Sequence, residues 1–286
     1  MSQYKTDAED KDMTRPLIIY HGNCMDGSTA AWCFWRKYRD QADFVAGYFD
    51  QPAPEVAGRS VFLLDFSYKR PIVTAMLQSA ASVTLIDHHK SALEDLADLP
   101  GLHYFTDLER SGATLAWDYL FPGEARPVLL NHIEDRDLWR FQLPATREIL
   151  ASLYSYDFSF ALWEELMQAD QASIVPMALE GRAIERNHHK NLAHMLQTCQ
   201  RRMVIGGVDV PVANIPGMMA SDAGHLMAQG EAFAACYTDT ASGRKFELRA
   251  SATGSDVSLI ALEYGGGGHA KAAGFMVPRS HPLAQV

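Results

Sequence analysis

The chain has 286 residues, of which 48% are hydrophobic and 21% are charged, a composition typical of a folded protein and a length that suits two domains. Its formal net charge of −10 argues against a protein that covers long nucleic acid through a broad basic surface. No apolar run reaches the roughly 18 residues that cross a bilayer, so no membrane segment is expected.

The chain opens with a polar segment, residues 1–14, that lacks the apolar stretch of a secretory signal and is expected to be a loose tail. Its four cysteines, at positions 24, 33, 199 and 236, show no C-x-x-C spacing. Neither a disulfide framework nor a zinc knuckle is therefore indicated. These features favour a reducing, cytoplasmic setting.

Between residue 15 and about residue 120 the pattern alternates between apolar runs and helical stretches. The runs are PLIIY, SVFLLDF, SVTLI and LHYFT, and the stretches after them begin GSTAAW, RPIVTA, SALEDL and SGATLA. Runs without polar alternation, separated by helices, are typical of a parallel sheet covered on both faces. The fold class predicted is therefore α/β, and ligands of such sheets bind beyond the carboxyl ends of the strands.

The second half of the chain has a different pattern of apolar and polar residues. Residues 156–201 are predicted to form a helical connector. From residue 202 to 286, two β-rich runs broken by Gly-Gly and by Ser-Gly predict hairpins, and helices are expected at 220–229 and 256–265. This pattern predicts a smaller α+β domain.

Polar side chains gather where the predicted strands end. In chain order they are His21, Cys24 and Asp26, then Asp65, then Asp87, His88 and His89, and later Asp135 and Asp137. Any one of them has a simpler explanation, because an aspartate such as Asp65 often only forms a turn or caps a helix. Their joint arrangement predicts one crevice lined by carboxylates and imidazoles, a mixture that suits Mn²⁺ or a similar metal.

Several motifs resemble those of the DHH phosphoesterase superfamily. LIDHHK matches the naming motif, YHGNCMDGSTAA the first motif, LLDFS the second and IEDRDLWRF the fourth. The segment GGGGHAKAAGF is similar to the signature of the DHH-associated C-terminal domain. The resemblance runs from about Leu17 to Phe275.

The resemblance implies a two-metal phosphoesterase, with a DHH domain at residues 15–155 and a substrate-binding domain at 202–286. It implies that Asp65 bridges two Mn²⁺ ions, that Asp26, His88 and Asp137 (or Asp135) hold one ion, and that His21 helps to hold the other. His89 would face the substrate phosphate and Asp87 would orient the histidines. Two cations about 3.5–4 Å apart can bind phosphoryl oxygens and acidify a water molecule.

The glycine run has a physical reason of its own. Without Cβ atoms, Gly266, Gly267 and Gly268 allow the backbone to approach a ligand and to point N–H groups at phosphate. His269 would add a donor, and Arg249 or Arg244 a charged fork suited to phosphate oxygens.

Cys24 departs from the family pattern, which has an aspartate at the corresponding place and one more residue after the histidine. Three interpretations stay open: a thiolate ligand that favours a softer metal, a neighbour that leaves one ion weakly held, or an inert cysteine. Asn23 could supply an oxygen instead.

Short RNA or a dinucleotide such as pGpG is the substrate class that the resemblance favours, and long duplex nucleic acid is not expected. Tyr264 and Phe275 could stack on bases. An exopolyphosphatase or a nucleotide bisphosphate phosphatase is an alternative. A second alternative is a non-catalytic nucleotide-binding regulator, if Cys24 disables one metal site. A homodimer stays open.

Overall fold

The computed structural model describes residues 15–22, 24–49 and 51–285, so the predicted tail and Asn23 lie outside the described part. The chain forms two compact units. Unit 1 takes the described residues up to His88 together with 98–138 and 158–168, and unit 2 takes 89–97, 139–157 and the chain from 169 onward. These units interleave along the chain, and the domain boundaries suggested by the sequence stay a prediction.

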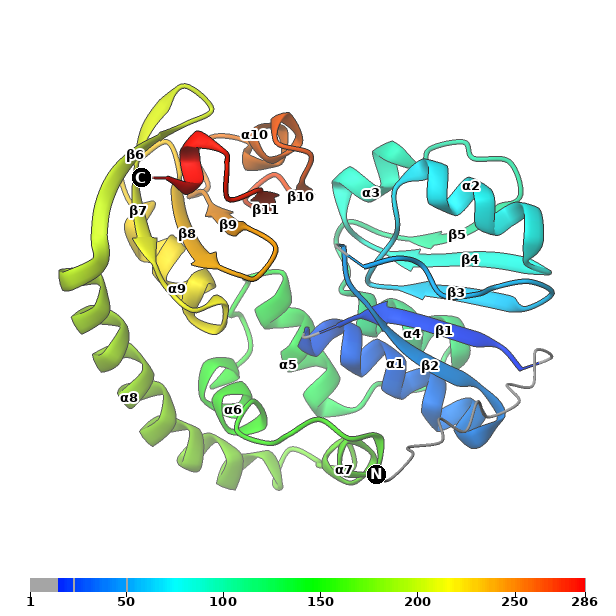
Figure 1. Cartoon of the computed structure of the whole chain (residues 1–286). Coiled ribbons are helices and arrows are strands. Elements are labelled where there is room, and N and C mark those ends of the chain that lie inside the picture. Colours follow the sequence, from blue (N-terminus) through cyan, green and yellow to red (C-terminus); the bar gives the residue numbers. More distant parts are fainter. Residues whose placement is uncertain (1–14, 23, 50, 286) are drawn as a thin grey trace, which may run out of the picture. The chain divides into compact units, whose positions relative to one another are not determined.

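Unit 1 is built on a five-stranded sheet in the order β2-β1-β3-β4-β5, with every neighbouring pair parallel (Figure 1). The strands are β1 (Leu17–His21), β2 (Asp43–Gly47), β3 (Ser60–Leu64), β4 (Ser82–Asp87) and β5 (Leu102–Thr106). The predicted α/β fold with a parallel sheet is confirmed. Strand β2 was not predicted, because its residues are only partly buried except for Gly47 and form no apolar run.

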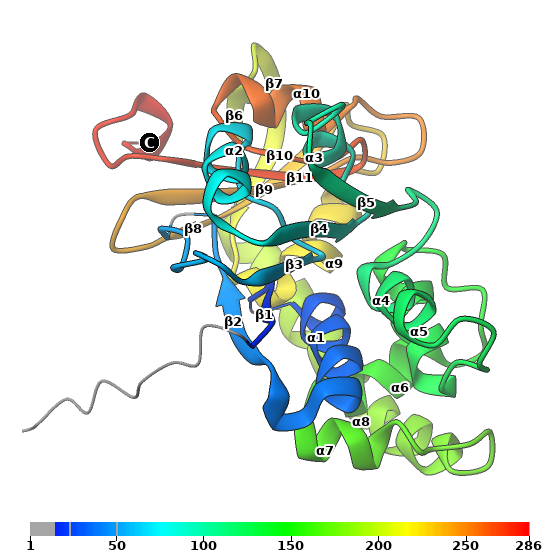
Figure 2. The same ribbon diagram turned by 90° about the vertical axis from the view of Figure 1, so that its right-hand side faces the viewer.

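The helices of unit 1 are α1 (Met25–Tyr38), α2 (Arg70–Ser79), α4 (Gly112–Leu120), α5 (Val128–Asp137) and α7 (Phe160–Leu166), with a 3₁₀ turn at Arg39–Gln41. From β1 the chain crosses to β2 on one side, and from β3 it crosses to β4 on the other. Because both crossovers are right-handed, α1 and α2 cover opposite faces of the sheet, as Figure 2 shows. The order of the strands therefore reverses between β1 and β3, which is where sheets of this kind bind ligands.

The core of unit 1 lies on both faces of these central strands. Leu17, Ile18 and Ile19 follow one another in β1 and are all at most 2% exposed. Trp32 and Phe34 of α1 are fully buried on one face. Each such side chain contributes roughly 1.5–3 kcal/mol of burial, so the strand ends are held by a rigid scaffold.

Unit 2 contains a six-stranded sheet in the order β10-β11-β9-β8-β7-β6, in which only β7 and β8 run parallel. Its strands are β6 (Gln200–Ile205), β7 (Val208–Asn214), β8 (Ala234–Asp239), β9 (Arg244–Arg249), β10 (Gly267–His269) and β11 (Ala272–Val277). The two predicted hairpins are present as β6–β7 and β8–β9. Gly206 and Gly207 both have positive φ, 56° and 75°, as a tight hairpin turn requires.

The helices of unit 2 are α3 (Lys90–Asp95), α6 (Thr146–Leu153), α8 (Ile174–Cys199), α9 (Gly217–Met227) and α10 (Val257–Glu263), with a 3₁₀ turn at Pro282–Ala284. Ala220 and Ala223 of α9 pack on one face of the sheet, and Val257 and Ala261 of α10 pack on the other. Among the described residues, none of the helices is both long and apolar enough to span a membrane.

Candidate metal centre

The candidate centre lies in unit 1, where the chain leaves β1, β3 and β4. Strand β1 ends at His21, Asp65 directly follows β3, and His88 directly follows β4. Because the three strands are adjacent and parallel, their carboxyl ends share one edge of the sheet, at the reversal point between β1 and β3.

Asp65 lies between two histidine rings. Its Oδ1 is 3.1 Å from Nε2 of His88, and its Oδ2 is 3.3 Å from Nδ1 of His21. Its backbone has a left-handed φ of 52°, and its N–H donates to the carbonyl of Ile86. Residues other than glycine rarely adopt this conformation, and aspartate tolerates it better than most. The turn therefore aims the carboxylate back across the strand ends.

His88 is the centre of a group of three carboxylates. Its Nε2 lies 3.1 Å from Asp65, 3.5 Å from Asp137 and 3.8 Å from Asp26. Ligand atoms of Asp26, Asp65 and His88 all lie within 4.8 Å of one another, a spacing that could hold a metal ion. Burial alone would lower the pKa of His88, but its hydrogen bond with Asp65 and the surrounding carboxylates outweigh burial and raise the pKa to about 10. The cluster therefore favours a positive charge at its centre.

Asp26 is held by the start of helix α4. Its two carboxylate oxygens accept hydrogen bonds from the backbone N–H groups of Gly112, at 2.6 Å, and Ala113, at 3.0 Å. Burial raises the pKa of Asp26 well above its usual value, and the charges of Asp137 and Asp65 add to this effect. Gly112 and its neighbour Ser111, the cap of α4, were missed by the sequence reasoning. Their signal was the small-residue start SGAT of a helix.

The two candidate aspartates of the fourth motif have different surroundings. Asp137, the last residue of α5, reaches His88, whereas the buried Asp135 interacts electrostatically with His132 on the same helix. Asp87 is fully buried, and its Oδ1 accepts the backbone N–H of His88 at 2.8 Å. The structure thus brings His21, Asp26, Asp65, His88 and Asp137 together.

Cys24 lies at the same edge, as the residue that precedes helix α1. Burial is the main cause that raises the pKa of its thiol well above the usual value. The negative charges of Asp65, Asp137 and Asp26 raise this pKa further. The thiol is therefore a neighbour of the carboxylate group and carries its proton at neutral pH when no cation is present. Each of the four cysteines is free of disulfide bonds.

His269 and Arg249, the predicted phosphate contacts, lie in unit 2 on one face of its sheet. His269 of β10 pairs with Ala272 of β11, which in turn pairs with Arg249 of β9. Paired residues on adjacent strands project from the same face, so both side chains share a face across the small Ala272. Arg249 also donates to Ser221 on α9, at 2.8 Å. Arg244 instead forms a two-pronged ion pair with Asp239.

Gly267 and Gly268 of the glycine run lie in β10, beside helix α3. A Cβ atom on Gly266 would overlap the carbonyl oxygen of Gly274, and one on Gly267 would lie 2.6 Å from Oγ of Ser91. The N–H of Gly268 donates to that same hydroxyl, at 2.8 Å. These glycines are therefore required by close packing, a reason that the sequence reasoning did not consider.

His89 begins the segment of unit 2 that contains α3. Its ring stacks on that of His269, with centroids 4.6 Å apart. Lys90, the next residue, forms an ion pair at 2.9 Å with Asp256, the residue that precedes α10, so two contacts hold this segment against β10 and the start of α10.

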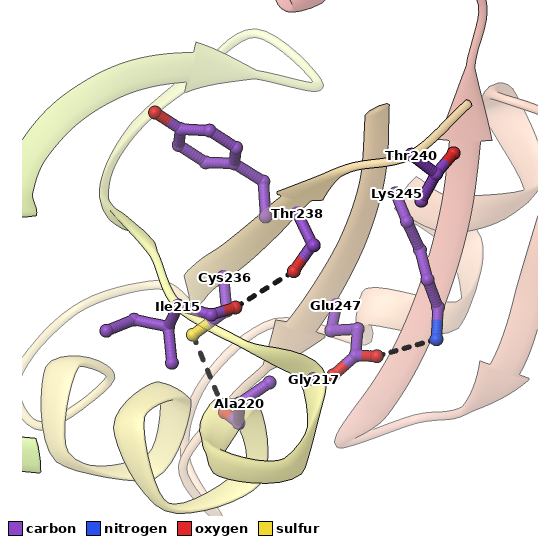
Figure 3. A pocket seen from close by; sticks show the side chains of 9 residues that line it. Ile215, Gly217, Ala220, Cys236, Thr238, Thr240, Lys245 and Glu247 are labelled. Atoms are coloured by element: carbon purple, nitrogen blue, oxygen red, sulfur yellow. Dashed lines mark hydrogen bonds and ion pairs between the residues drawn. The ribbon is translucent and has the colours of Figure 1, made fainter. Parts of the chain in front are cut away.

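The expectation that Phe275 stacks on bases is wrong, because its side chain is only 4% exposed and belongs to the core of unit 2. Tyr264 is partly buried and its ring stacks on that of Phe275. Unit 2 also has a pocket of about 180 Å³ between α9 and strands β8 and β9, shown in Figure 3. Two of its lining residues, Lys245 and Glu247, form an ion pair at 2.7 Å. The pocket is lined by none of the predicted site residues.

The sequence was compared with protein families and with known proteins. No protein-family model matches the chain. An uncharacterized protein of Acanthamoeba polyphaga mimivirus is 27% identical over 287 residues, covering 90% of this chain and 66% of the relative. The chain thus spans slightly less than two thirds of the length of that relative.

Two solved structures are similar to the chain in fold. The DHH domain of a protein described as a member of a ribosomal protein family superposes with a TM-score of 0.57 and 14% identity, covering 92% of this chain and 82% of that one. A pGpG-specific phosphodiesterase from Vibrio cholerae has a TM-score of 0.47 and 15% identity, covering 93% and 94%. The chain therefore has the fold of a DHH domain, as its motifs predicted.

Proposed function

We propose that the chain is a metal-dependent phosphoesterase that hydrolyses phosphodiester bonds in short oligoribonucleotides or dinucleotides such as pGpG. The observation that carries this proposal is the group of Asp26, Asp65 and Asp137 around Nε2 of His88, all within 3.8 Å of it. The superfamily fold supports the same conclusion. The group lies at the edge where parallel sheets of this kind usually bind ligands.

The donor set fits a pair of Mn²⁺ ions. Carboxylate and imidazole ligands suit Mn²⁺, and the carboxylate of Asp65 faces His88 with one oxygen and His21 with the other. Asp65 would therefore be the shared ligand, with Asp26, His88 and Asp137 on one side and His21 on the other. The raised pKa of His88 reflects the demand of the carboxylates for positive charge, and a bound cation would supply that charge in place of the proton, because a ligating imidazole is neutral. When bound, the ions would polarise the phosphoryl group and acidify water.

The protein side chains would have separate tasks. Asp87 accepts the N–H of His88 and so fixes the turn that carries that imidazole. Gly112 and Ala113 hold both oxygens of Asp26. In unit 2, His269 and Arg249 would bind phosphate oxygens from their common sheet face.

A small substrate agrees with the charge of the chain and with the spacing of these donors. His269 and Arg249 lie two strands apart, about 10 Å, which spans a nucleotide unit. With a net charge of −10, affinity must come from a few local contacts.

The test is a substrate panel with the full chain and Mn²⁺: pGpG, a short oligoribonucleotide, polyphosphate and adenosine 3′,5′-bisphosphate. We expect mononucleotides to form from pGpG, and we expect Asp65→Ala to abolish the reaction because both ions lose their shared ligand. Asp40→Ala, which removes an exposed carboxylate of unit 1, is the matched control. Release of phosphate from polyphosphate alone would support the exopolyphosphatase instead. Binding of pGpG without turnover would support the regulator, and full activity of Asp65→Ala would refute the metal centre.

A further inference from the structure

An exposed aromatic side chain lies at the edge of the unit 1 sheet that carries the metal centre. Strand β2 ends at Gly47, the register partner of His21 in β1, and Phe49 follows two residues later. Phe49 is 72% exposed, whereas every other phenylalanine, tyrosine and tryptophan in the described ranges is at most 53% exposed. A single exposed apolar residue needs no explanation by itself, so the surroundings of Phe49 decide what it can do.

The ring of Phe49 rests on a buried aromatic ring. Its centroid is 4.9 Å from that of Phe66, at an interplanar angle of 44°, and Phe66 is 1% exposed. Phe66 is held in turn by Tyr68, whose ring meets it edge to face at 4.9 Å. We call Phe49 together with Phe66 the aromatic platform. Because Phe66 belongs to the core of unit 1, the platform is anchored, and the exposed part of Phe49 is available to a ligand.

The backbone on either side of Phe49 is also held. The N–H of Gly22 donates to the carbonyl of Gly47 at 3.0 Å, and the N–H of Gln51 donates to the carbonyl of Tyr48 at 3.2 Å. A Cβ atom on Gly22 would lie 2.5 Å from the ring of Tyr48, so only glycine leaves room for this ring at the end of β1. The turn that presents Phe49 is therefore built into the strand ends.

The aromatic platform lies one side chain away from the metal centre. The centroids of the Phe49 and His21 rings are 5.6 Å apart, and Nδ1 of His21 is 3.3 Å from Oδ2 of Asp65. Only the imidazole of His21 therefore separates the platform from the carboxylate. In a nucleotide, only a ribose separates the base from the phosphate. A nucleotide whose phosphate binds at the metal centre can thus bring its base to the platform.

We propose that Phe49 is the base-stacking residue of unit 1, and that it selects nucleotides as the substrate class of the metal centre. The proposal rests on the proposed function, because it takes this centre to bind the substrate phosphate. Every base has a π face that can stack on an aromatic ring, whereas a polyphosphate chain offers none. Stacking on Phe49 therefore favours dinucleotides and short RNA over polyphosphate without selecting one base.

The first experiment replaces Phe49 by tryptophan and follows the fluorescence of the full chain with Mn²⁺ present. We expect GMP to quench the tryptophan introduced at this position, because a stacked base is in direct contact with its ring. Inorganic phosphate at the same concentration should leave the fluorescence unchanged. The wild-type chain, with its five native tryptophans, gives the baseline. This measurement needs no turnover.

The second experiment measures the kinetics of pGpG hydrolysis. Loss of a stacking ring weakens binding by roughly 5- to 100-fold, so Phe49→Ala should raise KM about tenfold with little change in kcat. Phe49→Leu, which keeps apolar bulk without a ring, should behave like Phe49→Ala, and Phe49→Tyr should keep the wild-type KM. Mn²⁺ affinity, measured by electron paramagnetic resonance of free Mn²⁺, should be the same in all three variants.

Tyr119→Ala is the matched control. It removes a ring that is 38% exposed and lies in α4, seven residues or about 10 Å along the helix from Gly112 at the metal centre. Its KM for pGpG should stay at the wild-type value, with melting temperatures recorded for every variant.

The outcomes separate the base contact from the other roles. An unchanged KM in Phe49→Ala, or the absence of quenching by GMP, would overturn the base contact. Loss of Mn²⁺ affinity in Phe49→Ala that is restored in Phe49→Leu would overturn it too, because the side chain would then only support His21. Quenching by GMP in a chain that does not hydrolyse pGpG would refute the proposed function and keep the base contact.

Discussion

Replacement of Gly112 by alanine tests whether helix propensity or packing against Asp65 and Asp26 has the larger effect on stability. Gly112 is the first residue of α4, and its backbone lies outside the left-handed region, so alanine is conformationally allowed. Local propensity alone would favour alanine by up to about 1 kcal/mol. A Cβ atom there would, however, lie 2.6 Å from Cβ of Asp65, 3.1 Å from its Cα and 3.0 Å from Oδ2 of Asp26.

These contacts leave little room for relaxation. Ordinary contacts at a Cβ begin near 3.4 Å, so the start of α4 or the Asp65 turn must move by several tenths of an ångström. Overpacking of this kind costs roughly 1–3 kcal/mol, which exceeds the gain in propensity. The same movement lengthens the hydrogen bonds from Gly112 and Ala113 to Asp26. A misplacement approaching 1 Å at a catalytic group can lower the rate by about 100-fold.

The assay compares Gly112→Ala with Gly217→Ala by thermal unfolding, Mn²⁺ binding and hydrolysis of pGpG. Gly217 is also the first residue of a helix, and its Cβ would meet only Oε1 of Glu247, at an ordinary 3.5 Å. We expect Gly112→Ala to melt at a lower temperature and to lose Mn²⁺ affinity, while Gly217→Ala keeps both properties. If the two variants behaved alike, the reasoning from packing would be refuted.

Three further predictions concern His269, Cys24 and His225. His269→Ala should raise KM for the substrate without lowering Mn²⁺ content, and loss of metal measured by elemental analysis would contradict this. Cys24→Ser should lower metal content if the thiolate is a ligand, whereas equal content and equal Mn²⁺ activation curves would show that the thiol takes no part. Burial lowers the pKa of His225, so the unfolded chain binds its proton more readily and stability should fall as pH drops below about 6.5. Thermal unfolding between pH 5 and 8 should show a smaller drop for His225→Phe, and identical pH profiles would exclude this histidine as the cause.

The sequence was sufficient to predict the strand-end side chains, because each follows an apolar run that is long enough to identify a buried strand. It also favoured Asp137 over Asp135, and the structure places Asp137 beside His88. Both hairpins and both helices of the C-terminal segment follow from the Gly-Gly and Ser-Gly breaks and from apolar spacing.

Other features depend on tertiary contacts that no local pattern reveals. The hydrogen bond from the N–H of Asp65 to Ile86 and the contact of Gly112 with Asp26 join residues that lie far apart in the chain. The packing of α3 within unit 2 likewise depends on Ser91 and Gly268, which are 177 residues apart. Glycines in the GGGG run were assigned to ligand approach, although their close packing against β11 and Ser91 already explains them.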